Sequence, residues 1–179
     1  FATYGGLMLK YARVAAATEA EFFSIGVEFN SLENEISLWE AMIRDIRSVY
    51  RGEITYAVNW DRAASPLGFA HLLDFVSLDA YFPHDLEPSA TVEQLTASWQ
   101  TWIVQLQEAE RLYGKPFVIA EIGIRSETGS YREPWHWGDA WGRTAELDLD
   151  MQGRFYQSSC YSLQEAVGGF YWWYVDLDL

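Results

Sequence analysis

The chain has 179 residues, half of them hydrophobic, and its 26 acidic against 12 basic residues give a formal net charge of −14. This composition excludes a wholly disordered chain, and the acidic surface argues against nucleic acid as a partner. No apolar run approaches the roughly 20 residues of a membrane span, so we expect no membrane partner. The single Cys160 excludes an intrachain disulfide framework and a cysteine-rich zinc site.

Helical and strand periods alternate along the chain. Apolar residues at three- to four-residue spacing predict helices at residues 4–21, 34–50, 91–114 and 151–167, and a weaker one at 67–73. Short runs rich in β-branched and aromatic residues predict strands at residues 22–29, 53–60, 75–82, 117–124 and 170–175. The longest stretch without a period lies between residues 125 and 148.

Local signals mark several of these ends. Thr91 and Gln94 have the spacing of a capping box, and Gly114 before Lys115 and Pro116 is a strong stop for the helix that they begin. Gly52 is the expected stop of the second helix. The first helix is predicted from apolar residues that share one face, namely Leu7, Tyr11 and Val14.

The fold class that follows is α/β, because repeated strand–helix units imply parallel strands joined by crossovers. The residues alone leave open a doubly wound sheet or part of a (β/α)8 barrel. No glycine-rich turn follows any strand, so a dinucleotide site has little support. A complete barrel needs about 250 residues. We therefore expect residues 1–179 to form a single unit that covers about strands 4–8 of a (β/α)8 TIM-type barrel.

Reactive residues in parallel α/β folds gather at the C-terminal ends of the strands. Here those ends carry Glu28, Asn59, Tyr81, Glu121 and the pair Trp172 and Trp173. Strict alternation puts Glu28 on one face with Gly26 and Ser24, and Val27 on the helix-covered face. By the same alternation Asn59 shares a face with Ala57 and Thr55, and Tyr81 with Asp79 and Ser77.

Two glutamates at the ends of different parallel strands favour glycoside hydrolysis. That reaction needs one carboxyl to protonate the leaving oxygen and a second to attack or to activate water. An aromatic pocket also separates the pKa values of two such groups. Taken alone, Glu121 is equally consistent with a structural ion pair to Arg125.

The segments SIGVEFNSLE, ITYAVNWD, FVSLDAYFP, KPFVIAEIGIRS, EPWHW and GGFYWWYVD follow one another in this order. Together they resemble the second half of glycoside hydrolase family 113, a β-mannanase family in the clan of retaining (β/α)8 hydrolases. The resemblance implies that Glu28 is the acid/base and Glu121 the nucleophile. It also implies that Tyr81 hydrogen-bonds the nucleophile.

The resemblance also implies a set of substrate contacts. Trp172, with Trp173 as the alternative, would form the floor of the sugar site, and Asn59 and Trp60 would line the cleft. Many clan members have Asn immediately before the acid/base, where this chain has Val27. The contact to the sugar 2-hydroxyl would then come from Asn59 or Asn30.

Three tryptophans in the long loop, Trp135, Trp137 and Trp141, either stack on sugar rings or form a hydrophobic clasp over the rim. No metal site is expected, since the three histidines are scattered, and no cofactor is implied. Asp148 is expected to complement the dipole of the last helix.

The resemblance thus implies a retaining β-1,4-mannanase that acts on a mannan-type oligo- or polysaccharide, and it implies no cofactor. Barrel strands 1–3 are not in this sequence, so a further segment or a second chain is expected to complete the barrel. A related β-glucan hydrolase and a non-catalytic carbohydrate-binding or structural barrel remain the alternative hypotheses.

Overall fold

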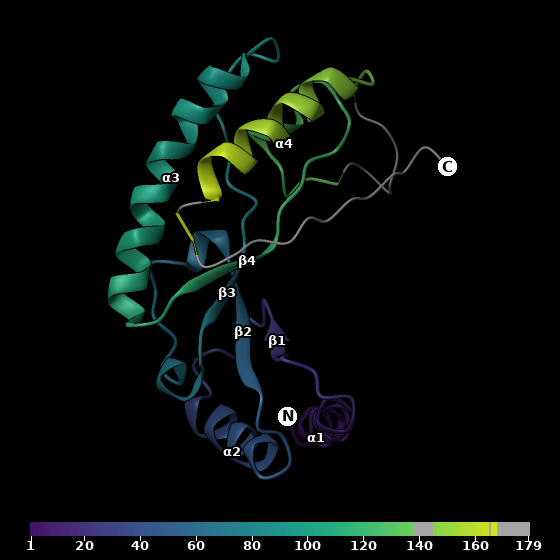
Figure 1. Cartoon of the computed structure of the whole chain (residues 1–179), viewed down its shortest axis with the longest axis vertical. Helices are drawn as coiled ribbons and strands as arrows, with labels where there is room; N and C mark the ends of the chain where they lie inside the picture. Colours follow the sequence, from purple (N-terminus) through teal and green to yellow (C-terminus); the bar gives the residue numbers. More distant parts are fainter. Residues whose placement is uncertain (138–144, 165, 168–179) are drawn as a thin grey trace.

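The computed structural model describes residues 1–137, 145–164 and 166–167. Along them helices and strands alternate (Figure 1). The elements are α1 (Ala2–Ala17), β1 (Phe22–Val27), α2 (Ile36–Arg47), β2 (Glu53–Asn59), β3 (Val76–Asp79), α3 (Val92–Tyr113), β4 (Phe117–Glu121) and α4 (Leu149–Leu163). Short 3-10 helices lie at Trp60–Arg62, Ala70–Leu72 and Ser130–Arg132. The strand expected at residues 170–175 lies outside the described residues.

The four described strands form one parallel sheet in the order β1-β2-β3-β4. Parallel pairing confirms the expectation from the repeated strand–helix units. A doubly wound sheet has a point at which the strand order reverses. Among the described strands the order never reverses, so they follow one another as in the wall of a barrel.

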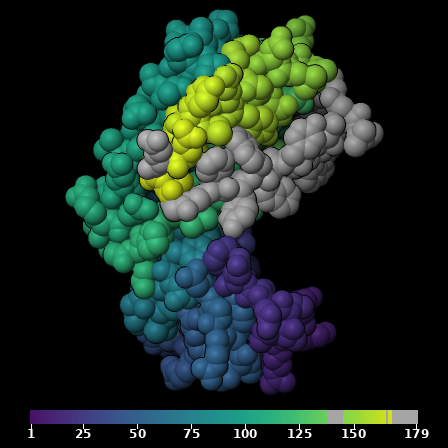
Figure 2. Space-filling model, viewed as in Figure 1, coloured from purple at the N-terminus to yellow at the C-terminus, as the bar shows by residue number. Residues whose placement is uncertain are grey.

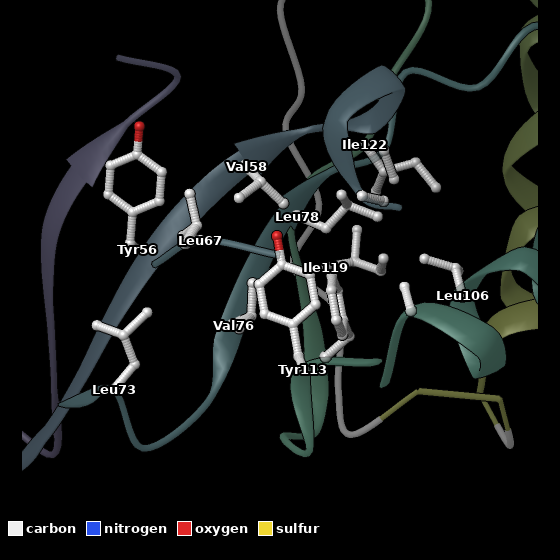
Figure 3. Close-up of a cluster of buried hydrophobic side chains, with 14 of the residues drawn as sticks. Tyr56, Val58, Leu67, Leu73, Val76, Leu78, Leu106, Tyr113, Ile119 and Ile122 are labelled. Atoms are coloured by element: carbon white, nitrogen blue, oxygen red, sulfur yellow. The ribbon is translucent and has the colours of Figure 1, made fainter. Parts of the chain in front are cut away.

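The hydrophobic core lies between the outer face of this sheet and the helices. Figure 3 shows one part of it, in which side chains of β2, β3 and β4 gather with residues of α3; these are Tyr56, Val58, Val76, Leu78, Ile119, Leu106 and Tyr113. The opposite face of β2 and β3 is small and polar, and there Thr55 Oγ1 and Ser77 Oγ share a buried hydrogen bond of 2.9 Å. The predicted alternation of β2 and β3 is therefore confirmed.

Much of the aromatic content fills this core. Trp39 is fully buried and stacks on Phe69, with ring centroids 4.9 Å apart, and Trp99 is also fully buried. Buried aromatic pairs of this kind stabilise a fold beyond the area that they remove from water.

The helix signals are confirmed at α3 and α4. Gln94 N donates to Thr91 Oγ1 and Thr91 N donates to Gln94 Oε1, which completes the capping box. Gly114 follows α3 in the left-handed conformation, with φ of 63°. Asp148 Oδ1 accepts from Met151 N and so caps α4.

The prediction for Gly52 was wrong, because α2 ends earlier, at Arg47. Gly52 is instead required by close packing. A Cβ at this position would clash with Tyr50 Oη, and that hydroxyl donates to Ala20 O. The glycine leaves room for the Tyr50 ring beside the start of β2.

The strict alternation predicted for β1 was also wrong. Ser24 pairs with Thr55 but Val27 pairs with Ala57, so β1 has one extra residue between these two pairs. A Cβ on Gly26 would meet Tyr56 and Trp39 on the helix-covered side, and Val27 is exposed rather than covered. The cause is a β-bulge, which changes the side to which later residues point.

At the N-terminal end, the apolar face of α1 is uncovered. The helix itself is confirmed, but Leu7, Tyr11 and Val14 are exposed in the described part of the chain. Helix α1 and helix α4 lie at opposite ends of the molecule (Figure 2). Within the described residues, no helix is both long and apolar enough to cross a membrane.

Candidate active site

Glu28 lies directly after β1 in a strained backbone conformation. Its φ is 50°, a region that residues other than glycine rarely adopt and that costs free energy. Glu28 N donates to Ala57 O at 3.0 Å, and the next residue, Phe29, donates its N–H to Tyr56 Oη at 2.8 Å. These two bonds attach the strained turn to β2 and so fix where the Glu28 side chain begins.

A network of hydrogen bonds around the buried Glu33 supports this turn. Tyr56 Oη donates to Glu33 Oε1 at 3.3 Å, and Arg62 Nη2 donates to Glu33 Oε2 at 3.0 Å. Glu33 is only 4% exposed, so the ion pair with Arg62 compensates its burial. Sequence reasoning missed Tyr56 and Glu33, since a tyrosine inside an apolar strand is typical of an ordinary core residue.

Glu121 is the last residue of β4, and a second β-bulge precedes it. Leu78 pairs with Ile119 but Asp79 pairs with Glu121, so β4 contains one extra residue at Ala120. In a regular strand Ala120 would have stood beside Asp79. The bulge therefore brings the Glu121 side chain to the polar inner face, next to Asp79.

Tyr81 orients the Glu121 carboxylate. Its Oη donates to Glu121 Oε2 at 2.7 Å, which is the contact that the family resemblance implies. Burial raises the pKa of Tyr81 above its ordinary value, and the hydrogen bond to Glu121 raises it further, so the phenol keeps its proton. Arg125, the alternative partner considered for Glu121, forms an ion pair with Glu127, with Nη1 and Oε2 2.6 Å apart.

Asp79 lies between the two glutamates. It is 1% exposed and pairs in register with Asn59 of β2 on one side and Glu121 of β4 on the other. No N–H or O–H of the described residues donates to either of its carboxyl oxygens. From the sequence, alternation places Asp79 on the same face as Tyr81. This position near the end of a strand was the signal that could have marked Asp79 as a site residue.

The carboxyl groups act on one another. Burial raises the pKa of Asp79 to about 8, and the charges of Glu121 and Glu28 add to this effect. Burial also raises the pKa of Glu28, and the charges of Glu121 and Asp61 add to it. Hydrogen bonding between the two side chains raises the pKa of Asp79 and lowers that of Glu28.

The expected cleft aromatics form two groups. Trp60, directly after β2, stacks on Trp135 with centroids 5.1 Å apart, and Trp135 is 42% exposed. Trp137 contacts the ring of Tyr81 edge-on, at 6.0 Å, so it lies near Glu121. The predicted floor residues Trp172 and Trp173, and Trp141, lie outside the described residues.

Asn59 is half-buried at the end of β2, and its Oδ1 is buried without a hydrogen-bond donor among the described residues. Asn30, the alternative for the sugar 2-hydroxyl, is exposed. In the described part of the chain, no three His, Cys, Asp or Glu residues are placed to hold a metal ion together.

Comparison with known proteins places this arrangement in a family. The β-mannanase AaManA of family 113 from Alicyclobacillus acidocaldarius, solved in complex with ManMIm, is 27% identical with a TM-score of 0.81, and the match covers 100% of this chain and 52% of that one. A second β-1,4-mannanase of family 113 is 26% identical with a TM-score of 0.80, covering 97% and 51% of the two chains. Among curated protein sequences none matches.

A fungal β-1,4-galactanase is 15% identical with a TM-score of 0.56, and the match covers 95% of this chain and 57% of that one. At this identity the likeness is one of fold alone. The described strands are thus part of a (β/α)8 barrel, and the chain spans about half the length of the mannanases that it matches. The profile of Glycoside Hydrolase Family 113 matches residues 1–179. The chain belongs to glycoside hydrolase family 113.

Proposed function

We propose that the intact protein is a retaining glycoside hydrolase that cleaves β-1,4-mannosidic bonds. The observation that carries this proposal is the placement of Glu28 and Glu121 at the C-terminal ends of β1 and β4, close enough for the charge of Glu121 to act on Glu28. The similarity to two β-mannanases at 26–27% identity supports mannan as the substrate.

In the proposed reaction Glu121 attacks the anomeric carbon while Glu28 gives its proton to the departing glycosidic oxygen. Glu28 then takes a proton from water as that water attacks the same carbon and Glu121 leaves as a carboxylate. The raised pKa of Glu28 supports its role as the acid, and the hydrogen bond from Tyr81 supports the orientation that a nucleophile needs.

Substrate contacts are proposed for the half-exposed groups around these carboxyls. Asn59 Oδ1 lacks a donor among the described residues, which favours it over the exposed Asn30 as the acceptor for a sugar hydroxyl. Trp60, Trp135 and Trp137 supply partly exposed ring surface for stacking on sugar faces. Trp172 or Trp173 stays the predicted floor of the site.

The barrel is proposed to be completed by a segment or a second chain that supplies strands 1–3. Among the described strands β1 is an edge strand, with Phe22 and Val27 exposed. The uncovered apolar face of α1 lies beside it in sequence. An exposed strand edge next to an apolar helix face is typical of a surface that another element covers.

The direct test is the hydrolysis of manno-oligosaccharides by the intact protein and its variants. We expect Glu121→Gln and Glu28→Gln each to lower kcat by about 10²-fold to 10⁴-fold or more, because each removes a carboxyl that changes charge during the reaction. Glu53→Gln is the matched control, since Glu53 is exposed at the opposite end of β2, and it should keep wild-type activity.

Wild-type turnover by Glu121→Gln would overturn the assignment of the nucleophile. Parallel assays on cello-oligosaccharides separate a mannanase from a β-glucan hydrolase. A binding titration of manno-oligosaccharides separates both from a non-catalytic module, which would bind them without turnover.

A further inference from the structure

We propose that Tyr56 and Glu33 are positioning residues that hold the Glu28 carboxyl where it can give its proton to the departing glycosidic oxygen. This inference rests on the proposed hydrolase function and adds to it two residues that the proposed mechanism does not use. The observation behind it is a series of hydrogen bonds that begins one residue after Glu28 and ends at Arg62.

The backbone at Glu28 needs support from outside the turn. Its φ of 50° lies in the left-handed region, which residues with a Cβ occupy only when surrounding contacts impose it. Two contacts do so here. Glu28 N donates to Ala57 O at 3.0 Å, and Phe29 N donates to Tyr56 Oη at 2.8 Å. The first contact joins two backbone groups, whereas the second depends on the tyrosine side chain.

Glu33 fixes the direction of the Tyr56 hydroxyl. A phenol has one proton, and Tyr56 Oη donates it to Glu33 Oε1 at 3.3 Å, which leaves the oxygen lone pairs for the N–H of Phe29. Burial raises the pKa of Tyr56, so the hydroxyl keeps this proton. The other carboxylate oxygen, Glu33 Oε2, accepts from Arg62 Nη2 at 3.0 Å. Because Glu33 is 4% exposed and Tyr56 is fully buried, water does not weaken the bonds between them.

The ring of Tyr56 also has a fixed place beside the turn. A Cβ on Gly26 would lie 2.9 Å from Tyr56 Cε2 and 3.0 Å from Trp39 Cη2, so only a glycine leaves room for both rings. The rings of Tyr56 and Trp39 are in contact, with centroids 5.2 Å apart. Trp39 Nε1 donates to Leu32 O at 2.9 Å. The loop after β1 is therefore attached to two buried rings, and the attachment to Tyr56 is the one nearer to Glu28 in the sequence.

Loss of this support would act on one part of the reaction. Without the Tyr56 hydroxyl, the N–H of Phe29 loses its acceptor, and the backbone of Glu28 can relax toward an ordinary φ that moves the carboxyl away from the glycosidic oxygen. Glu121 is oriented separately, by Tyr81, so the attack on the anomeric carbon keeps its geometry. The impaired step is the protonation of the leaving group. A dinitrophenolate leaves without a proton, so its departure does not need this step.

The test compares kcat/KM of the intact protein on manno-oligosaccharides with kcat/KM on their dinitrophenyl glycosides. We expect Tyr56→Phe and Glu33→Ala to lower the first value about 10-fold or more and to leave the second within about threefold of the wild type. Tyr50→Phe is the matched control. Its buried hydroxyl donates to Ala20 O beside the start of β2, so its loss should leave the ratio of the two values unchanged. For Tyr56→Phe, equal losses on both substrates or no loss on either would overturn the inference.

Arg62→Gln tests the same series of hydrogen bonds from its partly exposed end, where the Arg62 side chain is 39% exposed. It should change the ratio in the same direction by about threefold. An unchanged ratio would overturn the inference even if Tyr56→Phe did not fold.

Glu28→Gln separates this inference from the proposed function. It should show the same pattern, with a larger loss on manno-oligosaccharides. If Glu28→Gln shows the pattern and Tyr56→Phe does not, the inference is wrong and the proposed function stands. If Glu28→Gln loses activity equally on both substrates, the assignment of the acid is wrong and the inference is overturned with it.

Discussion

At the scale of single residues, removal of the hydrogen bond from Tyr81 to Glu121 tests how much the orientation of the Glu121 carboxylate contributes to activity. Tyr81→Phe keeps the ring and removes the donor of the 2.7 Å bond. A hydrogen bond to a charged group contributes about 1.5–3 kcal/mol, so we expect kcat to fall about 10-fold to 100-fold. Tyr161→Phe on the exposed face of α4 is the control and should leave kcat unchanged. Equal kcat values for the two variants would show that Tyr81 does not orient the nucleophile.

The raised pKa of Asp79 also predicts how the stability of the protein changes with pH. Its pKa is raised from 3.8 to about 8 by folding, so the folded state binds the proton more tightly than the unfolded state. Its contribution to stability is therefore fully present below about pH 4 and is lost as the pH rises to about 8.

Replacing Asp79 by Asn removes this pH dependence. We expect Asp79→Asn to be more stable than the wild type at pH 8 by at least about 1 kcal/mol, with the difference shrinking toward pH 4. Urea unfolding at several pH values measures it, and Asp85→Asn at an exposed position serves as the control. A variant less stable than the wild type at pH 8 would contradict the raised pKa.

At the scale of elements, the caps show how far local sequence determines structure. Thr91→Ala removes the side-chain acceptor of Gln94 N and should lower the free energy of unfolding by about 1 kcal/mol. Thr101→Ala, at an exposed position inside α3, is the matched control and should not destabilise the protein, because alanine favours a helix interior. If the two variants had equal stability, the capping box would not stabilise α3.

The elements themselves were predictable because periodicity and caps are local. The four long helices and the four described strands appear where the sequence predicts them, with ends that differ by a few residues. The weaker helix predicted at residues 67–73 is only a 3-10 helix at Ala70–Leu72. The two β-bulges were not predictable, since they depend on how β1 fits against β2 and β4 against β3. Strict alternation therefore misplaced Gly26 and Val27.

The candidate site was partly predictable for the same reason. Glu28, Asn59, Tyr81 and Glu121 are visible at strand ends, whereas the importance of Asp79 depends on its neighbours across the sheet. The positive φ of Glu28 and its support by Tyr56 depend on the packing of two strands and a loop. Residues that act through tertiary contacts leave no local pattern to read.

At the scale of the whole molecule, the chain matches about half the length of a family 113 mannanase, and its surface fits that of a barrel segment. The inner face of β2, β3 and β4 carries polar and acidic groups at its C-terminal end, and the edge strand β1 and the helix α1 before it expose apolar side chains. This arrangement fits a segment of a barrel wall whose lateral edge, at β1, is available for further strands.

The central claim is that Glu121 becomes covalently bonded to the sugar while Glu28 acts as acid and base. The most direct measurement is mass spectrometry of the intact protein after incubation with a fluorinated mannoside whose glycosyl-enzyme hydrolyses slowly, followed by mapping of the labelled peptide. The account predicts one added glycosyl group, located on Glu121 and absent from Glu121→Gln. A label on another residue, or efficient hydrolysis of mannan with inversion at the anomeric carbon, would contradict it.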